Sequence, residues 1–108
     1  MDHDQAVKAL SSLAHPVRLQ VFRALVVSGP SGLTPGVMQQ QLDLPASTLS
    51  FHLKELAAAG LVSIERASRH LVYRAVYDRM NGLISYLTEN CCQGSECALP
   101  TTEAACGC

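Results

Sequence analysis

Hydrophobic residues recur at helical spacing in five stretches of the chain. Apolar positions three or four residues apart predict helices over residues 4–13, 16–27, 35–43, 46–59 and 78–90. Between the last two, residues 61–66 alternate apolar and polar side chains and residues 70–76 form a second strand-like run, which predicts two strands around a short turn at 67–69. The pattern therefore predicts a mainly α-helical fold with one small β-hairpin.

Proline, threonine and glycine mark where several helices begin and end. Pro16 and Pro35 suit the first turn of a helix, and Thr34 can cap the helix that Pro35 begins. Gly60 is well placed to end the fourth helix. About three residues join the third and fourth helices, which is the spacing of a helix-turn-helix. The hairpin that follows is then the wing of a winged helix.

The two terminal helices carry apolar side chains that a small domain has little means to cover. In the last helix these residues have the spacing i, i+3, i+4 and i+7. A chain of 108 residues buries a modest core, so we expect a homodimer through the terminal helices. The expected dimer contacts are Val7, Leu10, Met80, Leu83, Ile84 and Leu87.

Length and composition narrow the class of protein. The chain has room for one domain, and its 48% hydrophobic content is too high for a disordered protein. No apolar run approaches the roughly 20 residues that span a bilayer. The first residues carry acids where a secretory signal carries basic groups, so we expect a cytoplasmic protein without a membrane partner. The net charge is −1, but the basic excess lies within residues 45–75.

That basic segment contains the candidate DNA-binding residues. A recognition helix presents short polar side chains near its N-terminus to base edges in the major groove, and a wing supplies phosphate or minor-groove contacts. Singly, such residues are often capping groups or a solvated face, but their order in a helix-turn-helix and wing favours DNA binding. The candidates are Ser47, Thr48, Ser50, His52 and Lys54 on the helix and Arg66, Arg69 and His70 on the wing, with Leu49, Leu53 and Leu56 facing inward.

Several segments resemble the ArsR/SmtB family of metal-responsive repressors. They are LAHPVR at 13–18, STLSFHLKEL at 47–56, AGLV at 59–62 and RHLVY at 69–73, within a resemblance that covers about residues 5–90. The resemblance implies a winged helix of four helices, a hairpin and a fifth helix, dimerised through the terminal helices. It also implies a repressor, not an enzyme, that binds operator DNA in its metal-free state. A two-fold dimer predicts a pseudo-palindromic operator.

All five cysteines lie in the last 18 residues, which points to a sensing site there. No export signal favours a disulfide framework. Two sensing sites known in the family are missing. The third helix, where one site uses a Cys-x-Cys pair, has no thiol. In the last helix Asp78 is followed by Arg79, and no histidine occurs after His70. Thiolates are soft ligands that select soft ions.

Trivalent arsenic or antimony is the expected inducer, with no organic cofactor. Cys91 and Cys92 diverge by about 100° in a regular helix, so one ion can hold both only where the helix frays. Cys97 lies five residues further on, and some arsenic-responsive family members resemble this arrangement. The predicted ligands are Cys91, Cys92 and Cys97, with Cys106 and Cys108 as additional candidates. The domains are then residues 1–92, for DNA binding and dimerisation, and a flexible cysteine-rich tail at 93–108.

Other thiol chemistries stay open. Divalent cadmium, lead or zinc, or oxidation of the cysteines, can act on the same scaffold. A structural zinc site fits less well, because it usually takes four ligands in paired Cys-x₂₋₄-Cys spacing and the tail matches that pattern poorly. A thiol enzyme also fits poorly, since Cys91 and Cys92 lie at a helix C-terminus beside Glu89, whereas catalysis needs a lowered thiol pKa.

Overall fold

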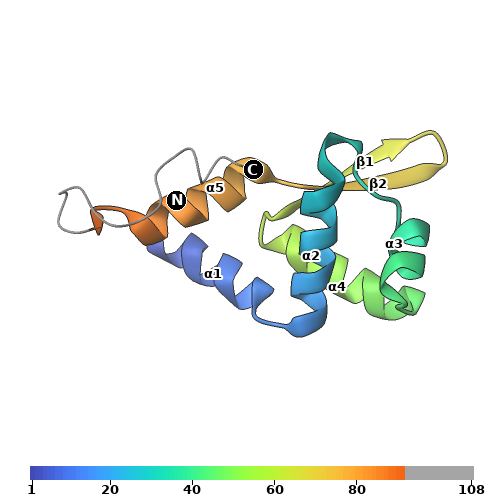
Figure 1. Cartoon of the computed structure of the whole chain (residues 1–108), viewed down its shortest axis with the longest axis horizontal. Coiled ribbons are helices and arrows are strands. Elements are labelled where there is room, and N and C mark those ends of the chain that lie inside the picture. The colour runs from blue at the N-terminus through green and yellow to red at the C-terminus, as the bar shows by residue number, and fades with distance from the viewer. Residues whose placement is uncertain (92–108) are drawn as a thin grey trace.

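A computed structural model describes residues 1–91, and Figure 1 shows its elements. A two-stranded antiparallel hairpin stands between a group of four helices and a fifth, which confirms the predicted winged helix-turn-helix order. The helices are α1 (His3–Leu13), α2 (Pro16–Ser28), α3 (Pro35–Leu42), α4 (Ala46–Ala58) and α5 (Tyr77–Thr88), with the short 3₁₀ helix η1 (Gly29–Ser31) and the strands β1 (Val62–Ala67) and β2 (His70–Ala75).

Local sequence explains the helix ends. Thr34 caps α3 by accepting a hydrogen bond from the Val37 N–H, with Pro35 in the first turn, as predicted. After α4, Gly60 adopts a φ of 78° and donates its N–H to the Ala57 carbonyl. The Leu61 N–H then reaches back to the carbonyl of Leu56, which completes a Schellman motif. These two motifs fix where α3 begins and where α4 ends.

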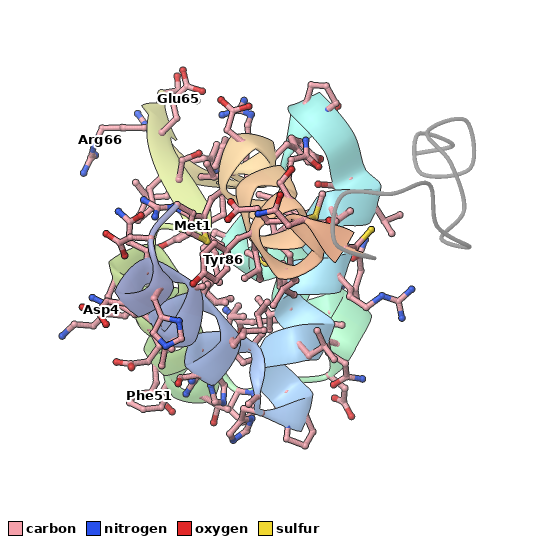
Figure 2. The ribbon with its side chains drawn as sticks, turned by 90° about the vertical axis from the view of Figure 1, so that its left-hand side faces the viewer. Met1, Asp4, Phe51, Glu65, Arg66 and Tyr86 are labelled. Atoms are coloured by element: carbon pink, nitrogen blue, oxygen red, sulfur yellow. The ribbon has the colours of Figure 1, made fainter. Side chains whose placement is uncertain are left out.

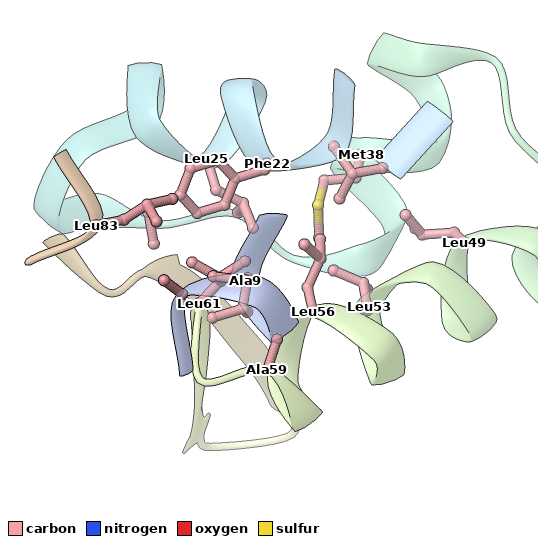
Figure 3. Close-up of a cluster of buried hydrophobic side chains, with 14 residues drawn as sticks. Ala9, Phe22, Leu25, Met38, Leu49, Leu53, Leu56, Ala59, Leu61 and Leu83 are labelled. Atoms are coloured by element: carbon pink, nitrogen blue, oxygen red, sulfur yellow. The ribbon is translucent and has the colours of Figure 1, made fainter. Parts of the chain in front are cut away.

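The helices pack around α2, and Figure 3 shows the resulting core. Leu25 on α2 is fully buried, close to Phe22 and to Leu83 of α5. The predicted inward stripe of α4 is confirmed, since Leu49, Leu53 and Leu56 are each at most 2% exposed. One apolar core therefore fixes α4 against the rest of the domain.

The wing is clamped at its base to the loop before α3. β1 and β2 pair from Val62 opposite Ala75 to Ala67 opposite His70, so the turn is shorter than the predicted 67–69. Leu33 and Tyr73 exchange two backbone hydrogen bonds, of 3.0 and 2.8 Å. The preceding Gly32 has a φ of 69°, and a Cβ there would lie 2.6 Å from the Tyr73 carbonyl oxygen. This close approach requires glycine.

The terminal helices lie side by side at the end of the molecule away from the hairpin tip (Figure 1). His3 Nδ1 and the Tyr86 hydroxyl are 3.0 Å apart, which links α1 to α5. α5 begins one residue earlier than predicted and ends at Thr88, two residues before the predicted end at Asn90. The backbone leaves the helical conformation at Glu89, whose ψ is 129°, and Asn90 then adopts a left-handed φ of 56°. No helix within residues 1–91 has the length and apolar character to cross a membrane.

Candidate DNA-binding face and thiol region

The outward face of α4 carries most of the predicted DNA-binding side chains. Ser47, Ser50 and Lys54 are exposed, and Thr48 is half-buried. The residue that caps α4 is Pro45, and no side chain caps this helix within the described residues. The hydroxyls near the start of α4 are therefore not used as its cap, which leaves them available to a ligand.

His52 does not belong to this outward face, so its predicted role in contacting DNA is wrong. Its side chain is only 5% exposed. The ring lies 4.6 Å from that of His15, and its Nδ1 accepts a hydrogen bond from the Arg18 Nε at 3.4 Å. His15, which caps α2, and Arg18 within α2 therefore cover His52. The sequence of α4 alone does not reveal this cover.

The environment of His52 favours its neutral form. Burial lowers the pKa of His52, and the nearby charges of His15 and Arg18 lower it further, while Glu55 acts in the opposite direction. A neutral ring can accept the Arg18 hydrogen bond, whereas a protonated Nδ1 cannot. His52 is thus a packing and hydrogen-bonding residue behind α4.

Arg18 joins three helices behind the outward face. Besides His52, its guanidinium donates to the Ser12 carbonyl at the end of α1, at 3.2 Å. Ser12 in turn is buried, and its hydroxyl donates to the Glu55 carbonyl of α4 at 3.5 Å. This cluster couples the position of α4 to the α1–α2 junction.

Phe51 is an outward-facing residue that the sequence reasoning missed. It is 55% exposed although it is the largest apolar side chain of α4. The Arg18 guanidinium carbon lies 5.8 Å from its ring centre, and the His52 ring meets it edge-on at 5.3 Å. Helical geometry is the signal that could have found it, because Phe51 is two positions after the buried Leu49, about 200° around the helix.

The wing presents its predicted cationic residues to the outside. Arg66, Arg69 and His70 are all exposed. Arg74 has a different task, since its guanidinium contacts Glu65 at 2.6 Å and the Pro30 carbonyl at 2.7 Å. Figure 2 shows Arg66 of the wing and Phe51 of α4 projecting on the same side of the molecule. The wing and α4 thus form a joint face with cationic side chains at its edge.

The predicted dimer contacts divide into exposed and buried residues. Val7, Leu10, Ile84 and Leu87 are between 42% and 59% exposed. Met80 is half-buried and packs against the core. Leu83 is 6% exposed and belongs to the core, so its predicted place in a dimer contact is wrong. It faces Phe22 and Leu25 because α5 also has to close its own domain (Figure 3).

Of the five cysteines, the structure describes Cys91. It is half-buried and lies three residues after the end of α5. The prediction that the helix must fray for Cys91 and Cys92 to share one ion stays a prediction, because Cys92 lies outside the described residues. Cys92, Cys97, Cys106 and Cys108 lie outside the described residues. Within residues 1–91 no three His, Cys, Asp or Glu side chains gather into a group that could hold a metal ion.

Comparisons with known proteins agree with this geometry. The profile of a helix-turn-helix domain family matches residues 13–65. The chain is 28% identical to the HTH-type transcriptional regulator YgaV of Escherichia coli strain K12, over 82% of this chain and 88% of that protein. It is 32% identical to the biofilm growth-associated repressor of Agrobacterium fabrum, over 81% of this chain and 72% of that protein.

Solved structures support the same fold. An ArsR-like transcriptional regulator from Rhodococcus sp. RHA1 superposes with a TM-score of 0.75 at 20% identity, covering 85% of this chain and 84% of that one. A homodimeric winged helix-turn-helix DNA-binding domain from Mycobacterium bovis has a TM-score of 0.64 at 21% identity, with 88% of each chain covered.

Fold, outward face and relatives together define a helix-turn-helix transcriptional regulator, a class of DNA-binding proteins that are not enzymes. Within this class, the chain belongs to the same family as the biofilm growth-associated repressor of Agrobacterium fabrum, and it shares its fold with solved regulators described as ArsR-like.

Proposed function

We propose that this chain is a homodimeric repressor that releases a pseudo-palindromic operator when trivalent arsenic or antimony binds its C-terminal thiolates. The observation that carries the DNA-binding half is the joint face of α4 and the wing. Ser47, Ser50 and Lys54 are exposed on α4, and Arg66 and Arg69 are exposed on the wing. Hydroxyl groups suit base edges and phosphates, while arginines suit phosphates and the minor groove.

A dimer is supported by the apolar side chains that α1 and α5 leave exposed at the opposite end. The described residues of this chain leave four large apolar side chains exposed here, at Val7, Leu10, Ile84 and Leu87. Neighbouring exposed apolar side chains of this kind often mark a protein–protein contact. The Mycobacterium bovis domain of the same fold is homodimeric. Two copies related by a two-fold axis would present two α4 helices to two half-sites.

The thiol switch is supported by the sequence and by the place of Cys91. The five cysteines gather in the last 18 residues, and soft thiolates favour arsenic and antimony over hard ions. Cys91 follows α5, the helix that carries Ile84 and Leu87. Drawing Cys91, Cys92 and Cys97 onto one ion would reshape the end of that helix, and with it the spacing of the two α4 helices. A coupling of about 1–3 kcal/mol weakens operator binding about 5- to 150-fold.

The test is a fluorescence-anisotropy titration of the full chain on a labelled duplex from the region upstream of its own reading frame. Arsenite and antimonite should release the duplex at lower concentration than cadmium, lead, zinc or an oxidant. Cys91→Ser and Cys92→Ser should bind the duplex like the wild type and lose release by arsenite. Val27→Ala, at an exposed position on α2, serves as the control and should still release.

Each half of the proposal has its own contradicting result. Retained release by arsenite in both Cys91→Ser and Cys92→Ser would remove the arsenic site. Release by a divalent metal or by the oxidant alone would transfer the switch to that chemistry. Absence of any sequence-dependent DNA binding would contradict the repressor itself.

A further inference from the structure

The outward face of α4 contains one large apolar side chain among polar ones. Ser47, Ser50 and Lys54 surround Phe51 on the exposed side of the helix. Phe51 is 55% exposed, whereas the other large apolar residues of α4 are at most 2% exposed. Since the apolar core of α4 is complete without it, Phe51 is not required there for folding.

The Phe51 ring also has two neighbours that support it on one side. The Arg18 guanidinium lies beside it, with the guanidinium carbon 5.8 Å from the ring centre, and the His52 ring supports it edge-on. Arg18 is itself fixed by its hydrogen bonds to His52 and to the Ser12 carbonyl. A pre-positioned side chain loses little conformational entropy on binding, so this arrangement suits a contact with a ligand.

The chemistry of the surrounding face selects the ligand. Lys54 lies near Phe51 on α4, and Arg66 of the wing projects on the same side of the molecule (Figure 2), which favours a polyanion as the ligand. The major groove of DNA offers one apolar feature, the C5-methyl group of thymine, and phenylalanine is among the side chains that contact it. We propose that Phe51 is a specificity-determining residue that reads a thymine methyl group in each operator half-site. This inference rests on the proposed DNA-binding function.

The experiment begins by selecting bound duplexes from a random-sequence library with the full-length wild-type chain. Each thymine of the selected duplex is then replaced by uracil, one position at a time, because uracil lacks only the C5-methyl group. For the wild type, the affinity should fall about 3- to 5-fold when one particular thymine of each half-site is replaced by uracil. This is the affinity that burial of one methyl group contributes. At that position Phe51→Ala should bind the thymine and uracil duplexes equally.

Two controls separate specificity from folding. Val27→Ala removes an apolar side chain that is 80% exposed on α2, and it should keep the wild-type preference for thymine. Phe51→Leu keeps an apolar group and should keep part of that preference. Both Phe51 variants should show the wild-type urea midpoint, because the core does not include Phe51.

The outcomes distinguish this inference from the proposed function. If a site is selected but no thymine is sensitive to uracil, or if Phe51→Ala keeps the sensitivity, the role of Phe51 is overturned and DNA binding stands. If the library yields no selected sequence, the proposed function and the inference fail together.

Discussion

α4 and α5 are amphipathic helices of almost equal length, with 13 and 12 residues, but their apolar sides are covered very differently. α4 buries Leu49, Leu53 and Leu56 within the chain. α5 buries Leu83 and leaves Ile84 and Leu87 more than half exposed. α4, which faces the proposed DNA, is therefore fixed by its own domain. The apolar side of α5, which precedes the cysteines, is only partly covered.

The contrast between α4 and α5 indicates which part of such a regulator is rigid and which part can respond to a ligand. Base contacts need a helix held in one position, and the core together with the Arg18–His52 hydrogen bond holds α4. A switch needs an element whose packing depends on something outside the chain. α5 meets that condition, because a second copy would cover its exposed residues and Cys91 follows its end.

Replacing Leu56 on α4 should have the largest effect on stability. Leu56 is fully buried, so Leu56→Ala should lower the free energy of unfolding by about 2–5 kcal/mol. Urea titration of each variant measures this, with the exposed Lys54→Ala as the control that should stay near the wild type. A small loss for Leu56→Ala would mean that α4 is no better fixed than α5.

Charges on the exposed side of α5 should separate the protomers without unfolding them. Ile84→Glu combined with Leu87→Glu places two carboxylates in the proposed dimer contact. Light scattering should show the monomer mass. Operator affinity should fall about 100-fold, because two half-sites are no longer bound as one unit.

Val27→Glu on α2 is the matched control for this double variant and should remain dimeric. A wild type that is already a monomer would contradict the contrast between the two helices.

A methyl group at Gly32 should loosen the wing from the helices that hold α4. Gly32→Ala forces a Cβ against the Tyr73 carbonyl at a positive φ, at an expected cost of about 1–3 kcal/mol. Thermal unfolding measures it. Gly36→Ala is the control: no atom lies within 4 Å of a Cβ there, and alanine within α3 should stabilise by about 0.5–1 kcal/mol. Equal melting temperatures of the two variants would show that the close approach of Gly32 to Tyr73 contributes nothing to stability.

Acid should weaken the support behind α4 by a smaller amount. Because the folded-state pKa of His52 is lowered, the unfolded chain binds more protons than the folded one as the pH falls below about 6.5. The stability that neutral His52 provides is present above that pH and is lost toward the lowered folded-state pKa. Urea titrations at pH 7.5 and 5.5 should show this loss, and His52→Gln should reduce it. An unchanged pH dependence in His52→Gln would assign the titration to another group.

The sequence predicted the fold well because short-range signals decide most of it. Helical periodicity correctly predicted that Leu49, Leu53 and Leu56 are buried. Thr34 correctly marked the start of α3, and Gly60 the end of α4. His52 could not be placed in this way, because its burial depends on Arg18 of α2 and on His15, which caps α2. Leu83 failed for a similar reason: a seam of apolar residues does not reveal which of them its own core takes.

The Leu33–Tyr73 bridge has a consequence for how such a regulator can be altered. It fixes β2 at its base, while the tip at Ser68 and Arg69 lies beyond the last strand pair, Ala67 with His70. Residues added in pairs at this tip would lengthen the hairpin and leave the loop before α3 undisturbed. The proposed reach of the wing along DNA and the proposed base contacts of α4 can therefore be varied independently, in evolution or by engineering.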